Sequence, residues 1–277
     1  MHLSGLYIYP VKSLRGCSVP VAEVDALGMI GDRRFLVVAP DGTFLTQRAH
    51  PRMALVQTEL DADSLTLSSA SAGRCIVARN TDSSTSPASL RSISVWRSHG
   101  LLADDCGDEP AAWLSSFLGI ACRLVRIGEK FIRPILNSSV AGPGDRVSFA
   151  DAYPFLVVGE RSLSHLNDRL IAHGEDPVPM DRFRPNLVVE GAPPFAEDGW
   201  TRFRLSGIVF QAAGPCARCV LTTIDQITAD RGAEPLRTLA TFRRDPSDPT
   251  HVNFGQNLIH ETKSGTLRVG DPIELLA

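Results

Sequence analysis

The chain has 277 residues, of which 43% are hydrophobic and 21% are charged. This composition is ordinary for a soluble globular protein and is enough for one large domain or two of average size. The net charge of −3 gives no overall attraction to nucleic acid or to an anionic membrane, so neither is an expected partner.

The sequence predicts a cytoplasmic protein. No apolar run is long enough to span a bilayer, and residues 1–5 lack the basic and apolar regions of a signal peptide. The cysteines are scattered apart from one pair, which does not resemble a disulfide framework. They are Cys17, Cys75, Cys106, Cys122, Cys216 and Cys219.

Short strands separated by turns are predicted for the first hundred residues. Pro40-Asp41-Gly42 is a hairpin signal between two apolar runs, and Asp61-Ala62-Asp63 is a second one. The predicted strands span residues 3–11, 34–39, 43–46, 53–60, 64–68, 93–96 and 100–103.

A helix that starts at Asp108 and ends at Gly119 is predicted next, because apolar residues recur there at helical spacing. A strand over 122–127 follows it. The stretch 128–145 contains several prolines and glycines and is predicted to be an irregular crossing between two lobes. The predicted domains are therefore residues 1–127 and 128–277.

The second half is again rich in short strands. An amphipathic helix over 162–173 and a short helix over 235–242 interrupt them. The strands are predicted at 155–158, 187–189, 203–205, 208–212, 252–260, 266–269 and 273–276. Many short strands with few helices predict a mainly β fold of the α+β kind, with β-barrel-like domains.

The segment Gly214–Asp225 contains the one Cys-x-x-Cys pair, Cys216 and Cys219. Such a pair can bind zinc, cycle as a disulfide, give one thiolate to a softer metal, or have no chemical role. Zinc would need two more ligands, and His251 and His260 are not at zinc-finger spacing. The strand-forming residues 220–224 that follow the pair disfavour a thioredoxin-like redox site. Spacing alone does not decide between the remaining alternatives.

Basic, hydroxyl and amide side chains stand at the ends of several predicted strands. Basic groups at strand ends can converge on one anion, and the guanidinium fork suits phosphate. For any single one of the basic groups, solvated surface charge is the favoured interpretation, unless several of them meet in one cleft. No glycine-rich phosphate loop is present, which disfavours the common nucleotide-binding folds. The side chains are Lys12, Ser13, Arg33, Arg48, Arg184 and Asn186.

Six motifs occur together in one order along the chain. They are Tyr9-Pro10-Val11-Lys12-Ser13, Gly31-Asp32-Arg33, Phe183-Arg184-Pro185-Asn186, Cys216-Ala217-Arg218-Cys219, Phe254-Gly255-Gln256-Asn257 and Val269-Gly270-Asp271-Pro272. In these motifs the chain resembles the MOSC-domain superfamily, in the branch of the amidoxime-reducing component and its bacterial relatives. The resemblance implies an N-terminal MOSC-associated β-barrel domain packed on a MOSC β-barrel domain.

The resemblance further implies a molybdenum cofactor, a pterin dithiolene with a phosphate tail. Cys219 falls on the metal-ligand position of the family and is the catalytic candidate. A thiolate suits a high-valent oxo-metal centre completed by dithiolene sulfurs, and Arg218 beside it would favour the ionised thiol. The positions implied to hold the pterin and its phosphate are Lys12, Ser13, Arg33, Arg184 and Asn186, with Arg48 and Arg218 as extensions.

The chain departs from the family pattern at Ala152 and Tyr153, where vertebrate members carry a Thr-Ser pair, so two hydroxyl contacts are lost. No four-cysteine ferredoxin spacing is present. We therefore expect electrons from a separate electron-transfer protein, either ferredoxin-like or a cytochrome or flavin reductase.

The resemblance implies an oxidoreductase that reduces hydroxylamines, amidoximes or N-hydroxylated bases. An alternative of another class is a binding module that carries the cofactor or a cysteine persulfide.

Overall fold

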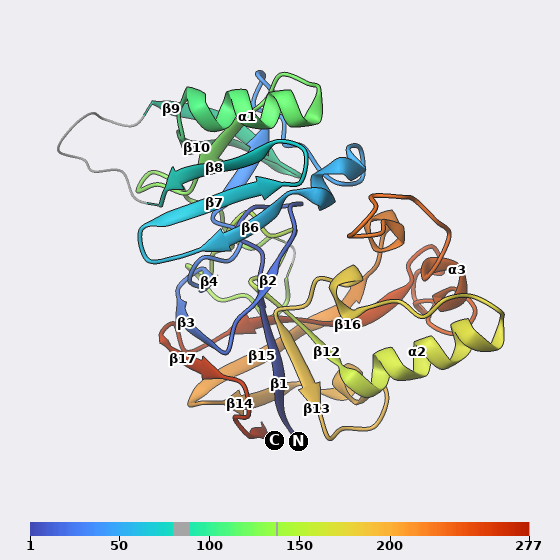
Figure 1. Cartoon of the computed structure of the whole chain (residues 1–277). Coiled ribbons are helices and arrows are strands. Elements are labelled where there is room, and N and C mark those ends of the chain that lie inside the picture. Colours follow the sequence, from blue (N-terminus) through green and yellow to red (C-terminus); the bar gives the residue numbers. More distant parts are fainter. Residues whose placement is uncertain (80–88, 137, 277) are drawn as a thin grey trace.

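The computed structural model describes residues 1–79, 89–136 and 138–276. Within these ranges the chain has eighteen strands and three α-helices, so the predicted mainly β class is confirmed. Figure 1 shows two lobes, with both termini at the outer end of the lower one.

An eight-stranded sheet forms the lower lobe. It collects strands from both ends and from the middle of the chain, and every neighbouring pair except β12 with β13 is antiparallel. The order is β18 (Ile273–Leu276), β14 (Arg202–Leu205), β15 (Ile208–Ala217), β16 (Asn253–His260), β12 (Phe155–Gly159), β13 (Leu187–Glu190), β1 (His2–Ile8) and β2 (Cys17–Ser18).

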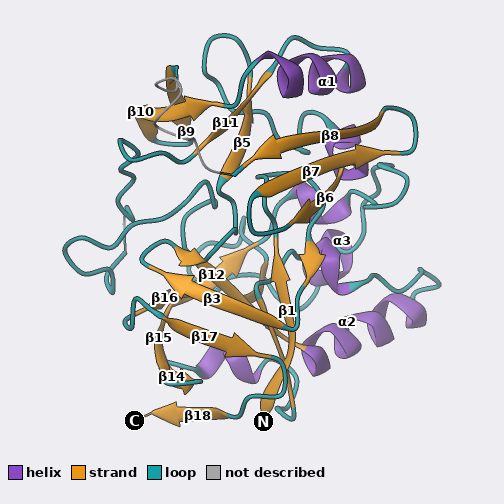
Figure 2. Cartoon of the chain, turned by 60° about the vertical axis from the view of Figure 1, so that its left-hand side comes forward, coloured by secondary structure: helices purple, strands orange, loops and turns teal. Residues whose placement is uncertain are grey.

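The start of the chain belongs to this lobe. Leu6 of β1 lies opposite Leu187 of β13, and both side chains are fully buried. A small sheet of β17 (Gly265–Arg268), β3 (Val21–Asp25) and β4 (Gly28–Met29) packs nearby and also joins early to late strands (Figure 2). The domain boundary at residue 127 stays a prediction, and the sequence did not indicate this pairing.

The upper lobe contains two further sheets and one helix. α1 (Asp108–Leu118) packs Leu114 and Phe117 into the core of this lobe. One sheet has the order β5 (Phe35–Val38), β11 (Arg123–Arg126), β10 (Ser98–Asp105) and β9 (Leu90–Val95). The other is β6 (Gln57–Leu60), β7 (Ser64–Ser69) and β8 (Gly73–Ala78), and β8 was not predicted.

α2 (Glu160–Ala172) crosses from β12 to the parallel strand β13. Its residues Leu166 and Leu170, one turn apart, are fully buried against Val158 in one hydrophobic cluster. α3 (Leu236–Leu239) packs in the same cluster through Leu239. No helix in the described part of the chain is long and apolar enough to cross a bilayer.

Four short 3₁₀ helices complete the structure, and two of them correct the sequence prediction. They are η1 (Pro51–Leu55), η2 (Met180–Arg182), η3 (Ala196–Gly199) and η4 (Val220–Thr223). The start of the predicted strand 53–60 is wrong because Pro51 begins a helical turn there. The strand expected over 220–224 is also wrong. The Thr222 and Thr223 hydroxyls donate to carbonyls three residues earlier, which favours a turn over a strand.

We predict that β1 stabilises the whole lower lobe. Leu6→Ala is expected to lower the free energy of unfolding by about 2–5 kcal/mol, because it leaves a cavity in the core. Ile76→Ala in β8 is the matched control. Its side chain is 56% exposed, so we expect a change of less than about 1 kcal/mol. Denaturant unfolding measures both, and equal losses would show that β1 is not an integral core strand.

Candidate functional site

One pocket between the two lobes contains all eight predicted site residues. It encloses about 760 Å³ of empty space, its open mouth included. The residues approach it from the loop after β1, the loop before β5, the loop between β5 and η1, the segment before β13 and the segment after β15. They are Lys12, Ser13, Arg33, Arg48, Arg184, Asn186, Arg218 and Cys219.

Asn186 joins three segments at the edge of this pocket. Its backbone N–H donates to Leu156 O at 2.8 Å, and its C=O accepts from Tyr7 N at 3.0 Å. Its side-chain Oδ1 accepts from Leu156 N at 3.2 Å and from the Arg33 guanidinium at 3.1 Å, while Nδ2 donates to Tyr7 O at 3.2 Å. The start of β13 is thereby tied to β1 and β12.

The Tyr9 ring contacts two guanidinium groups. Arg33 Cζ lies 4.3 Å and Arg184 Cζ 4.2 Å from the ring centroid. Arg33 donates to the Asp32 carboxylate at 2.6 Å, whereas Arg184 donates to the Leu14 carbonyl at 2.8 Å. Burial, with the nearby Arg33 charge, lowers the pKa of Arg184 to about 10.

Three pocket residues have a left-handed backbone, which is uncommon for residues other than glycine. Ser13 has φ 65°, Arg33 φ 47° and Arg184 φ 54°. Such conformations cost of order 1–3 kcal/mol each and gather at functional sites. The fold accepts this strain where it directs three side chains into one pocket.

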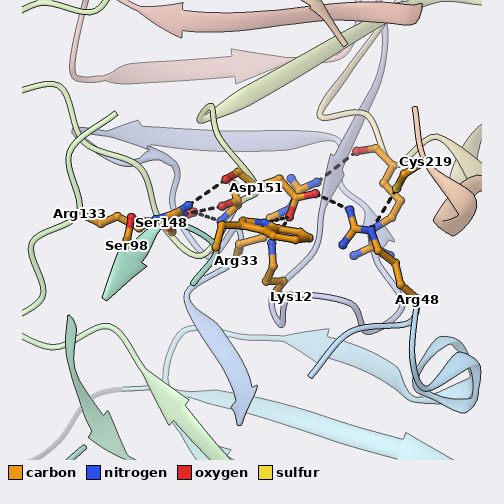
Figure 3. A network of polar contacts seen from close by, with 11 residues as sticks. Lys12, Arg33, Arg48, Ser98, Arg133, Ser148, Asp151 and Cys219 are labelled. Atoms are coloured by element: carbon orange, nitrogen blue, oxygen red, sulfur yellow. Dashed lines mark hydrogen bonds and ion pairs between the residues drawn. The ribbon is translucent and has the colours of Figure 1, made fainter. Parts of the chain in front are cut away.

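Asp151 lies at the centre of the polar network (Figure 3). Its carboxylate accepts from Lys12 Nζ, from Arg48 at 2.9 Å and from Trp96 Nε1 at 3.0 Å. Burial opposes ionisation of this carboxyl, but the Lys12 and Arg48 charges outweigh it and hold its pKa well below the usual value. Burial lowers the pKa of Lys12 to about 8, although the Asp151 charge opposes that shift.

The two thiols of the Cys-x-x-Cys pair have different neighbours. Arg48 Nε donates to Cys219 Sγ at 3.1 Å, and Arg218 donates to Cys216 Sγ at 2.9 Å. The expectation that Arg218 is the cation at Cys219 is therefore corrected, since Arg48 has that place. Cys216 lies at the end of β15, whereas Cys219 immediately precedes η4.

The histidines named as zinc candidates lie in different environments. His260 is fully buried, and its Nε2 is 2.7 Å from the Asp25 carbonyl oxygen. His251 is exposed beside Asp248. Among the described residues, no three His, Cys, Asp or Glu side chains are grouped to hold a metal ion.

The residues of the pocket fit an anionic group that carries a soft metal. Five cationic side chains line the pocket, against the single carboxylate of Asp151. Arg218 Nε is buried without a hydrogen-bond partner, so one donor remains available. The Cys219 thiol supplies a soft ligand. Asp151, Trp96 and Tyr9 were not predicted as site residues, although Tyr9 belongs to the first motif.

Fold and pocket together define a strand-rich protein with a thiol inside a pocket lined by five cationic side chains. Its sequence matches the model of the MOSC N-terminal beta barrel domain over residues 1–121 and that of the MOSC domain over residues 144–274. The chain belongs to the MOSC-domain family.

Relatives of known name support this membership. The chain is 39% identical to mitochondrial amidoxime-reducing component 1 of Mus musculus, over 98% of this chain and 81% of that protein. It is 36% identical to the Homo sapiens protein of the same name, over 98% of this chain and 82% of that protein. It is also 32% identical to molybdenum cofactor sulfurase of Danio rerio, over 94% of this chain but 32% of that protein.

The Lys12 environment predicts a pH-dependent stability. Because the pKa is about 8 in the folded protein against 10.5 for an unperturbed lysine, the folded chain loses this proton first. Between these pH values the unfolded chain binds more protons, so stability rises with pH. We expect Lys12→Met to remove about 3 kcal/mol of that rise, the free energy that corresponds to a pKa of about 8 against 10.5. Chemical denaturation of the wild-type and Lys12→Met proteins across this pH range measures their free energies of unfolding. A difference between the two free energies that does not change with pH would contradict the prediction.

Proposed function

We propose that this protein is a molybdenum-cofactor-dependent oxidoreductase that reduces N-hydroxylated compounds such as hydroxylamines, amidoximes or N-hydroxylated bases. The observation that carries the proposal is that Cys219 lies in the same pocket as five cationic side chains. One of them, Arg48, donates a hydrogen bond to Cys219 Sγ. The amidoxime-reducing names of the Mus musculus and Homo sapiens relatives support the reaction class.

In this proposal Cys219 Sγ is the protein ligand of the metal. Arg48 Nε donates a hydrogen bond to that sulfur and holds it in place. Arg218, which donates to Cys216 Sγ, is a further cationic contact for the cofactor in this proposal. The groups that hold the pterin and neutralise its phosphate are Lys12, Ser13, Arg33, Arg184 and Asn186.

The overall reaction breaks the N–O bond of the substrate. It consumes two electrons and two protons, and it releases an amine or amidine together with water. When bound, molybdenum would supply the acceptor for the substrate oxygen and the two-electron change. The Asp151 carboxylate keeps Lys12 and Arg48 in place at the edge of the pocket through ion pairs.

Electrons come from a separate redox protein in this proposal, ferredoxin-like or a cytochrome or flavin reductase. The six cysteines are free thiols spread over both lobes, and their spacing does not match a ferredoxin cluster. The mammalian relatives are named mitochondrial, and a cytoplasmic location for this chain stays a prediction.

The alternative function is a module that carries the cofactor or a cysteine persulfide. The Danio rerio relative named molybdenum cofactor sulfurase favours it. Metal analysis of protein made in a cofactor-competent host separates the two. Stoichiometric molybdenum with reductase activity supports the enzyme, and a cysteine persulfide without metal supports the carrier.

Cys219→Ser tests the catalytic assignment. We expect loss of amidoxime reduction with an artificial electron donor, and partial retention of cofactor, because the cationic residues still bind its phosphate. Cys216→Ser is the matched control, since it removes the neighbouring thiol while Arg48 still faces Cys219. Molybdenum content and turnover are measured for each variant, and unchanged turnover in Cys219→Ser would exclude the assignment.

A further inference from the structure

A second, larger hollow adjoins the Cys219 pocket. It encloses about 1630 Å³ with its open mouth included. Asp151, Ala152 and Tyr153 line both spaces, so the two adjoin at that segment. The walls of the second hollow are largely apolar and aromatic. The apolar and aromatic residues include Phe44, Trp96, Pro134, Leu136, Val147 and Tyr153, and the polar ones include Arg97, Arg133 and His251.

Trp96 is held rigidly although it is 43% exposed. Its Nε1 donates to Asp151, and the Phe44 ring contacts it edge-on with centroids 4.9 Å apart. Arg48 Cζ lies 4.9 Å from the Trp96 ring centroid. The residue also has a left-handed backbone with φ 53°, which is strained for a bulky side chain. A strained, fixed and exposed ring is typical of a binding surface.

The position of Trp96 connects the hollow to the proposed metal ligand. Arg48 lines the Cys219 pocket and Trp96 lines the second hollow, so their contact lies at the boundary of the two spaces. The same Arg48 side chain donates to Cys219 Sγ. One guanidinium thus separates the aromatic ring from the thiol.

The charged groups nearest the rings are either paired or, like Arg97, exposed to solvent. Arg133 donates to the carbonyls of Ser148, Ala150 and Asp151 at 2.8, 2.5 and 2.8 Å. The Asp151 carboxylate is compensated by Lys12 and Arg48. A neutral flat ring can therefore enter without leaving a buried charge unpaired, which favours an uncharged aromatic ligand over an ionic one.

We propose that Trp96 is a specificity-determining residue that stacks on the aromatic part of the substrate. The N–OH group then points past Asp151 into the Cys219 pocket. This inference rests on the proposed function, and it adds a preference for aryl over small alkyl N-hydroxylated compounds.

The test compares benzamidoxime with acetamidoxime, which share the reacting group and differ in the ring. For Trp96→Leu we expect the benzamidoxime-to-acetamidoxime ratio of kcat/KM to fall about threefold to tenfold, the range of one aromatic stacking contact. Trp96→Phe keeps a ring but loses the Nε1 donor, so its ratio should stay within about twofold of wild type. Molybdenum content is measured to compare equally loaded enzymes.

An unchanged ratio in Trp96→Leu overturns the proposal, and so does an equal fall in Trp96→Phe, which would indicate a positioning role through Asp151. Equilibrium binding of benzamidoxime without any electron donor, measured by saturation-transfer NMR, gives a readout that needs no turnover. Weaker binding by Trp96→Leu than by Trp96→Phe supports the inference even if the wild-type protein reduces neither compound and the proposed function fails. Equal binding, or none by the wild type, overturns it.

Discussion

The pocket depends on the amide of Asn186. Its side chain and backbone together bind Tyr7, Leu156 and Arg33, which are 179, 30 and 153 residues away along the chain. An amide both donates and accepts, which a carboxylate or an apolar side chain of similar size does not. The same contacts therefore align β1 with β12 and β13 and direct Arg33 to the pocket.

This alignment brings the positive charges of Arg33 and Arg184 close together, and each guanidinium has a different partner that offsets the repulsion. Arg33 has the carboxylate of Asp32, whereas Arg184 has only a carbonyl and the face of the Tyr9 ring. Burial raises the pKa of the Tyr9 phenol, so the ring remains neutral and acts as an aromatic surface. Cation–π contacts are weaker than a full counter-ion. A bound anion would supply the remaining negative charge.

The sequence pattern was enough to predict strands beside the pocket such as β12 and β16, but the strand predicted over 208–212 is too short, since β15 continues to Ala217. The convergence of their side chains was not derivable from spacing, because it requires β1 to pair with β13 across the whole chain. Asp151 lies between two alanines and carries no spacing signal, yet it pairs with two of the cations. Residues 220–223 have strand-forming side chains, and the threonine hydroxyls turned them into η4.

That turn makes the two cysteines unequal. If β15 continued through the pair, Cys216 and Cys219 would alternate along one strand and face opposite sides of the sheet. Instead β15 ends at Ala217, and Cys219 reaches Arg48 from the other lobe while Cys216 keeps Arg218. Arg48 also pairs with Asp151 and contacts the Trp96 ring. The thiol, the central carboxylate and the aromatic hollow therefore share one guanidinium, which couples the proposed metal ligand to the surface that would receive the substrate.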